Sequence, residues 1–275
     1  TENQICFALS TNGLILLRQE DSLFLCNKKG EIVGIVGDLL PETPSGTKAK
    51  YTITQIAEGN YLLSATVDRS AGTTVLSTSI TSYYDYIEDA SAFSYEQEEQ
   101  TGHKTTLYVG YHTSNGIQRT LLRPHNWTFT ETAYPDYEIQ NATLVLRDII
   151  GNGKPTVVEA RQYLGADWPE YTLMWSDEMD KYGPKITQVT INEGNGWEQD
   201  YLYNFDITIF VRCWYDGSVD WRKGIMLKGD DACESSTTTH QQYFASNQYP
   251  TEALRPRIEV TSAYTPTIDN GVYYI

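Results

Sequence analysis

The sequence predicts an all-β protein, with a small N-terminal β unit followed by a larger, jelly-roll-like β-sandwich that carries one short helix. Three observations predict this class. Short apolar or alternating stretches recur along the whole chain, and turns rich in Asn and Gly separate them. One segment alone has the three-to-four-residue apolar spacing of a helix.

The first 72 residues are typical of β-hairpins. The strands expected there cover residues 5–9, 14–17, 23–26, 31–36, 51–56 and 61–67. Between them lie turns such as 11–13 and 27–30, whose Asn and Gly residues accept the positive φ of tight hairpins. We therefore predict an N-terminal β-rich unit over residues 1–72.

A Ser/Thr-rich stretch without a periodic apolar face follows, and we predict a connection over residues 73–82. The larger β-sandwich is predicted for 83–265, and 266–275 for a linker or the start of a following domain. The strands expected in the larger unit are 106–109, 118–123, 142–147, 156–160, 224–228 and 257–261. Many short strands with turns between them favour a sandwich.

The helical segment begins after Asp206. Apolar residues follow it at helical spacing: Ile207, Phe210, Val211 and Trp214. The carboxylate of Asp206 is a good N-cap, because it can accept hydrogen bonds from the free backbone N–H groups of a first turn. We expect a short helix whose apolar side is buried.

The charge balance limits the partners. The formal net charge is −16, from 36 acidic and 20 basic side chains, so the mean field repels phosphate backbones and anionic lipid surfaces. No apolar run approaches the roughly 20 residues that a membrane helix needs. We predict no nucleic-acid partner and no membrane insertion.

Catalytic motifs are missing from the sequence. It contains no Gly-x-Ser-x-Gly elbow, no Gly-rich phosphate loop and no His-Glu-x-x-His, and its four histidines are scattered. We predict that the chain is not an enzyme. Paired carboxylates for glycoside hydrolysis stay open, because any two of 36 acids can meet across a cleft.

Aromatic side chains are the conspicuous chemical resource, with 21 Tyr and 6 Trp. Exposed rings stack on the apolar faces of sugars, so they are typical of carbohydrate-binding surfaces. The candidates in turn-rich or weakly patterned surroundings are Tyr83, Tyr84, Tyr95, Tyr111 and Trp127. The alternative for each is ordinary surface or edge packing.

Two acidic clusters are candidates for calcium, which takes six to eight oxygen ligands. One contains Asp85 and Asp89, and the other contains Asp230 and Asp231. Neither has the spacing of an EF-hand. The alternative is that both are solvated acidic loops.

The four cysteines form two pairs, Cys6 with Cys26 and Cys213 with Cys233. No Cys-x-x-Cys motif or histidine cluster accompanies them, so a zinc site is not expected. A disulfide within either pair and buried free thiols are both compatible with the sequence.

The larger unit resembles the DNRLRE family, a β-sandwich module of bacterial and archaeal surface proteins that is similar in kind to carbohydrate-binding modules. Seven segments carry the resemblance in order: Asp85-Tyr86-Ile87, residues 106–110, 118–123, 142–146, Trp168 to Trp175, Asp206 to Trp214 with 224–228, and 255–260. Residues 1 to about 70 look like the small β unit that precedes this module in wall-associated and Rhs-type proteins. Residues 269–275 resemble the opening strand of a ricin-type β-trefoil.

The resemblance implies a secreted or cell-surface location, a polysaccharide context and no catalytic residues. Our expectation is therefore a non-catalytic extracellular module of a larger bacterial protein, which binds a polysaccharide or cell-surface glycan. Its other partners would be further domains of the same polypeptide. The alternative is a structural spacer or adhesin segment that presents neighbouring domains and has no small ligand.

Overall fold

The structure is a computed structural model, and it describes most of the chain. The described residues are 3–10, 14–19, 22–29, 32–36, 51–58, 60–67, 78–84, 86–134, 137–151, 155–191, 201–264, 267–269 and 272–274.

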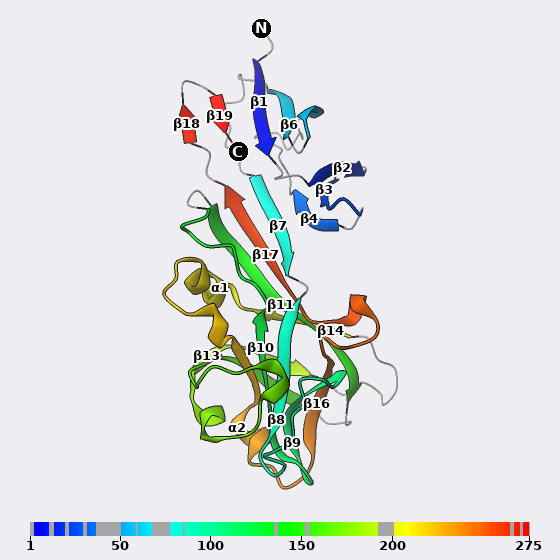
Figure 1. The fold of residues 1–275 in the computed structure, drawn as a ribbon, viewed down its shortest axis with the longest axis vertical. Coiled ribbons are helices and arrows are strands. Elements are labelled where there is room, and N and C mark those ends of the chain that lie inside the picture. Colours follow the sequence, from blue (N-terminus) through cyan, green and yellow to red (C-terminus); the bar gives the residue numbers. More distant parts are fainter. Residues whose placement is uncertain are drawn as a thin grey trace. The chain divides into compact units, whose positions relative to one another are not determined.

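The chain divides into two compact units (Figure 1). Unit 1 comprises Thr1–Tyr83, Tyr134–Gln140 and Val260–Ile275, and unit 2 comprises Tyr84–Ala133 and Asn141–Glu259. The described residues of both are dominated by antiparallel strands, so the predicted all-β class is confirmed. The predicted extent of the larger unit, 83–265, differs from this division at 134–140 and 260–265, which group with unit 1.

Unit 1 contains two sets of paired strands. The first has the order β18-β19-β1-β6-β5, and its strands are β1 Asn3–Ser10, β5 Tyr51–Ala57, β6 Asn60–Val67, β18 Thr267–Asp269 and β19 Val272–Tyr274. The second joins β2 Ile15–Gln19, β3 Ser22–Cys26, β4 Ile32–Val36 and β7 Thr78–Tyr84. The two sets meet where the backbone N–H of Leu16 donates to the hydroxyl of buried Tyr61 at 3.0 Å.

Unit 2 is a larger antiparallel array. Its strands are β8 Ile87–Phe93, β9 Thr106–His112, β10 Gly116–Pro124, β12 Thr156–Tyr163, β13 Tyr182–Ile191, β14 Leu202–Asp206, β15 Ile225–Gly229 and β16 His240–Ala245. The 3-10 helices are η2 Glu170–Thr172, η3 Asp177–Asp180, η4 Trp221–Lys223 and η5 Glu252–Leu254. Two further strands, β11 Tyr137–Gly151 and β17 Arg257–Tyr264, have residues in both units.

Strand β10 is the branch point of unit 2. One of its edges pairs with β8 over Gln118–Pro124. Its other edge pairs with β9 at Gly116–Gln118 and with β15 at Thr120–Leu122. The array therefore continues in two directions from β10, through β9 to β16 and through β15 to β12.

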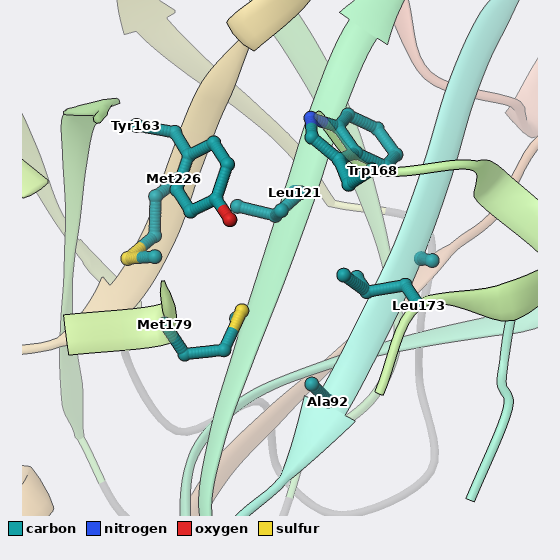
Figure 2. Packing of buried hydrophobic residues seen from close by; sticks show 8 residues of the cluster. Ala92, Leu121, Tyr163, Trp168, Leu173, Met179 and Met226 are labelled. Carbon is teal, nitrogen blue, oxygen red and sulfur yellow. The ribbon is translucent and has the colours of Figure 1, made fainter. Parts of the chain in front are cut away.

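A hydrophobic cluster packs on one face of β8, β10 and β15 (Figure 2). Ala90, Ala92, Leu121 and Met226 come from these strands, and Tyr163 comes from the end of β12. The segment that contains η2 and η3 covers them with Trp168, Leu173 and Met179. The alanines of β8 are short enough to leave room for these large side chains, since protein interiors are close-packed.

The predicted helix is present as α1, Thr208–Tyr215. Ile207 occupies the N-cap position and its side chain makes no capping hydrogen bond, so the prediction of Asp206 as the N-cap is wrong by one residue. The carboxylate of Asp206 still accepts a hydrogen bond from the backbone N–H of Thr208 at 3.0 Å, which satisfies a free donor of the first turn. The predicted apolar side is buried: Ile207, Phe210, Val211 and Trp214 are each at most 5% exposed.

A second short helix corrects the prediction of a single one. Helix α2, Asp231–Glu234, lies in the segment that we expected to be an acidic loop. Asp230 is its N-cap, because its carboxylate accepts a hydrogen bond from the backbone N–H of Cys233 at 2.8 Å. Capping is thus the observed use of the Asp230 carboxylate.

Several strands were missed by the sequence analysis. β7 occupies residues 78–82 of the stretch expected to be a connection, and its sequence is Thr-Ser-Ile-Thr-Ser-Tyr-Tyr, in which β-branched and aromatic residues favour a strand. Strands β8, β13, β14 and β16 were also not expected. Each mixes polar and apolar residues on both faces or is flanked by charged turns, which weakens the period-two signal.

Cys26, Cys213 and Cys233 are free thiols in the part of the chain whose side chains are described. The Cys6 side chain lies outside that part. Burial, together with the carboxylates of Asp230 and Glu234, raises the pKa of Cys233 to about 12, so this thiol stays protonated at neutral pH. Among the described residues, every helix is too short or too polar to cross a membrane.

We expect Trp214→Ala to lower the free energy of unfolding by about 3–5 kcal/mol, because it empties a site where the indole is 1% exposed and packs against Trp127 and Phe210. Urea denaturation would measure the loss. The matched control is Ile209→Ala on the same helix, where the side chain is 67% exposed and the cost should stay within about 0.5 kcal/mol. Equal stabilities of the two variants would contradict the packing of α1.

Candidate functional site

A pocket of about 230 Å³ lies in unit 2 where β8, β10, β9 and β16 adjoin. Strands β8 and β9 and their neighbours β10 and β16 are drawn together in Figure 1. The lining residues come from these strands and from the loops that join them: Phe93, Glu96, Glu99, Lys104, Tyr108, His112, Asn115, Gln118, Gln241 and Tyr243.

Strand register brings the lining residues together. Gln118 on β10 is opposite Phe93 on β8 at one edge and opposite Gly110 on β9 at the other. On the far side of β9, Gly110 is opposite Gln241 of β16. Side chains on one face of a sheet recur every second residue, so Tyr108 lies on the same face as Gly110. Tyr243 of β16 is opposite Tyr108 and lies on this face too.

Gly110 has a backbone conformation that few other residues adopt, with φ of +117°. A Cβ atom at this position would lie 2.2 Å from the carbonyl oxygen of His240 and 3.2 Å from the Sγ atom of Cys233. Glycine is therefore required for the close approach of β9, β16 and α2 beneath the pocket.

Three aromatic rings form the apolar wall of the pocket. The rings of Phe93 and Tyr108 have centroids 5.2 Å apart and are nearly perpendicular, at 88°. Tyr108 and Tyr243 are 5.3 Å apart, at 72°. Edge-to-face contacts of this kind stabilise the wall, and they make it angular rather than flat.

Charged groups lie at one side of this wall. The ammonium of Lys104 is paired with the carboxylate of Glu99 and lies 5.5 Å and 5.7 Å from the ring centroids of Phe93 and Tyr108. Burial raises the pKa of Glu99, but the hydrogen bond and charge of Lys104 outweigh it and lower this pKa overall. Glu99 is therefore ionised at neutral pH, and the ammonium of Lys104 forms an ion pair with it.

Gln118 supplies an acceptor that the folded chain does not use. Its side chain is 2% exposed, and its Oε1 atom has no hydrogen-bond partner among the described residues. An unsatisfied buried acceptor costs about 1–3 kcal/mol. A ligand that donates a hydrogen bond inside the pocket would remove this cost.

The opposite face of β10 holds a network of buried charges. Arg119 is 3% exposed, and its guanidinium donates to both carboxylate oxygens of Glu234, at 3.0 Å and 2.8 Å, and to Asp180 at 2.8 Å. Lys228 is fully buried, with its ammonium 3.6 Å from Glu234 and 3.7 Å from Glu159. These pairs join β10, β12, β15, α2 and η3 behind the pocket.

The aromatic residues proposed from sequence lie outside the pocket lining. Tyr95 is 63% exposed and is hydrogen-bonded to Tyr111, which raises the pKa of Tyr111. These two residues neighbour the lining residues Glu96 and His112 in sequence. Trp127 is 4% exposed and packs against Tyr84 and Trp214, as a core residue does. Tyr83 is half-buried in unit 1.

The pocket residues were missed for an identifiable reason. Two of their strands were predicted, but β16 was not, so Gln241 and Tyr243 had no expected neighbours. Gln241 and Gln242 are adjacent polar residues that are both buried, so the segment lacks the apolar–polar alternation that is typical of a strand with one packed face.

The structure separates the residues proposed for calcium. Asp85 lies outside the described residues. Asp89 lies on β8, where it is opposite Leu122 of β10. Asp230 lies just beyond β15, three residues after Leu227, and Leu227 is opposite Thr120 of β10. Asp231 is exposed and is 3.4 Å from the ammonium of Lys228. Within the described ranges, no group of three or more His, Cys, Asp or Glu side chains is arranged to hold a metal ion.

Asp89 instead forms a buried acidic pair with Glu170. Asp89 is 1% exposed, and its Oδ2 atom accepts from the backbone N–H of Asn247 at 2.6 Å. Glu170 accepts from the backbone N–H of Asp89 at 3.2 Å and from the amide of Gln248 at 3.0 Å. Burial raises the pKa of Asp89 well above its ordinary value, the Asn247 hydrogen bond lowers it, and repulsion from Glu170 raises it further.

In comparisons with known proteins, no family model and no curated protein sequence matches this chain. The resemblance to the DNRLRE family therefore stays an expectation that rests on the seven sequence segments.

The raised pKa of Asp89 predicts that the free energy of unfolding falls as the pH rises. The unfolded side chain ionises near pH 4, so the contribution of Asp89 to stability is fully present below about pH 4. It is lost as the pH rises from there through the folded pKa, at up to about 1.4 kcal/mol per pH unit. Asp89→Asn should remove this dependence, and urea melts at stepped pH would measure the difference between the two proteins.

Glu98→Gln is the control for this experiment, because Glu98 is exposed and its replacement should leave the pH profile of stability unchanged. Parallel profiles for the parent and Asp89→Asn would show that Asp89 ionises in the folded protein as it does in the unfolded chain.

Proposed function

We propose that this chain is a non-catalytic, extracellular glycan-binding module, and that the pocket at Gln118 is its binding site. The observation that carries the proposal is a pocket lined by three aromatic rings and by Gln118, whose buried Oε1 atom has no hydrogen-bond partner among the described residues. Sugars combine hydroxyl donors with apolar C–H faces, and this pocket offers a partner for each.

The charges of the pocket support binding rather than hydrolysis. Glycoside hydrolysis needs one carboxylic acid that stays protonated at neutral pH, which requires a raised pKa. Lys104 lowers the pKa of Glu99, and Glu96 accepts a hydrogen bond from the side-chain amide of Asn115. The lowered pKa keeps Glu99 ionised at neutral pH, and an ionised carboxylate serves well as an acceptor for sugar hydroxyls.

Other parts of the proposal extend the expectations from sequence. The module would belong to a larger secreted or cell-surface bacterial protein and would hold that protein against polysaccharide. The net charge of −16 supports a partner that is neither nucleic acid nor anionic membrane. A bound calcium ion is a separate proposal, which melts in millimolar Ca²⁺ and in EDTA would test: Ca²⁺ that binds the folded state should raise the melting temperature.

The second candidate function is a spacer or adhesin segment without a small ligand. The burial of Trp127 and the perpendicular rings of Phe93, Tyr108 and Tyr243 favour it, because these four described residues do not form a flat aromatic strip for a polysaccharide chain. A spacer would bind no glycan, with or without Ca²⁺.

A glycan array distinguishes the two functions. We expect the parent chain to bind a defined set of glycans and Gln118→Met to bind them about tenfold more weakly, since one hydrogen bond of about 1.4 kcal/mol is lost. Gln118→Met should not destabilise the fold, because the Oε1 atom that it removes has no partner within the described part of the chain.

The matched control is Gln188→Met on β13, an exposed position away from the pocket lining, which should bind as the parent does. Absence of binding by the parent chain across the array would support the spacer instead.

A further inference from the structure

We infer that the pocket takes the terminal residue of a neutral glycan chain, and that it excludes acidic sugars. This inference rests on the proposed function and adds the class of ligand. Three features of the pocket support it: its size, the angles between its rings and the balance of its charges.

The size of the pocket limits the ligand to about one sugar ring. Its volume of about 230 Å³ is below the roughly 300–1,000 Å³ of sites that enclose drug-sized molecules. A site that reads the interior of a polysaccharide instead needs a surface long enough for several consecutive residues. The pocket therefore fits a chain end.

The ring geometry leads to the same conclusion. A flat strip of coplanar rings can stack on successive sugars of a chain, but Phe93, Tyr108 and Tyr243 meet at 88° and 72°. Perpendicular rings present a face and an edge at a corner, so they contact two sides of one ring. Tyr108 takes part in both ring contacts. The ammonium of Lys104 lies within 6 Å of the ring centroids of Tyr108 and Phe93, so it closes one side of the corner.

The balance of charge selects a neutral ligand. The lining contains the carboxylates of Glu96 and Glu99, and the ammonium of Lys104 is already paired with Glu99. The Oε1 atom of Gln118, which has no partner in the part of the chain that the structure describes, can accept a hydrogen bond from a ligand donor. A uronic acid would bring a third carboxylate into the pocket and would meet repulsion from Glu96, whereas a neutral sugar brings hydroxyl donors.

Ligand-observed NMR and calorimetry can test this with defined probes. The neutral probes are methyl glycosides of glucose, galactose, mannose and N-acetylglucosamine, and the acidic probes are glucuronic and galacturonic acids. Cello-, malto- and chito-oligosaccharides of two to six residues test chain length. We expect at least one neutral series to bind with an affinity that does not rise with length, and each acid to bind about tenfold more weakly than its neutral counterpart.

Two variants make the test specific to the pocket. Gln118→Met should weaken the neutral ligand about tenfold while Gln188→Met leaves it unchanged. Glu96→Gln removes one repelling charge from an exposed position, so it should narrow the difference in affinity between glucuronic acid and methyl glucoside.

Two results would overturn the inference and leave glycan binding intact: an affinity that rises steadily with oligosaccharide length, or tighter binding of the acids than of the neutral glycosides. Absence of binding by every probe and on the glycan array would instead remove the proposed function, and the inference with it.

Discussion

The buried positive charges of Arg119 and Lys228 are the constraint on which unit 2 depends. A charge removed from water is tolerated only with paired and hydrogen-bonded partners. Glu234 meets this need for both cations, with both of its oxygens on Arg119 and one of them 3.6 Å from Lys228. Asp180 and Glu159 complete the pairing from η3 and β12. Burial lowers the pKa of Arg119, yet the carboxylates of Glu234 and Asp180 outweigh this effect and raise the pKa overall.

The same network determines what the other face of β10 presents. Neighbouring residues of a strand point to opposite faces, so anchoring Arg119 behind the sheet directs Gln118 into the pocket. Thr120, one step along the pocket face, is hydrogen-bonded to Ser91 of β8 and to the carbonyl of Tyr108. A register slip of one residue would move Arg119 and Leu121 to the pocket face and turn Gln118 toward the apolar cluster, which makes the register strongly specified.

Sequence reasoning succeeded where one physical signal dominated. The strands around Leu107, Leu121 and Met226 were found from their apolar runs, and α1 was found from the helical spacing of its apolar residues. The residues that line the pocket had no sequence pattern in common, because a pocket is assembled from residues that are distant in sequence. Gln118 and Tyr243 are 125 positions apart, and strand register alone brings β10 and β16 to either side of β9.

Two buried oxygen atoms that the described residues leave without a hydrogen bond, Asp89 Oδ1 and Gln118 Oε1, lie on one face of the β8–β10 pair. Their strand neighbours Ala90 and Arg119 point to the opposite face, where the apolar cluster lies. Buried oxygen atoms without a hydrogen bond destabilise the fold by about 1–3 kcal/mol apiece. The packing of Trp168, Leu121 and their neighbours on the opposite face offsets this cost. A sheet that is stabilised by one apolar face can therefore keep buried acceptors without hydrogen-bond partners on its other face. A binding site for a ligand with many hydrogen-bond donors needs such acceptors.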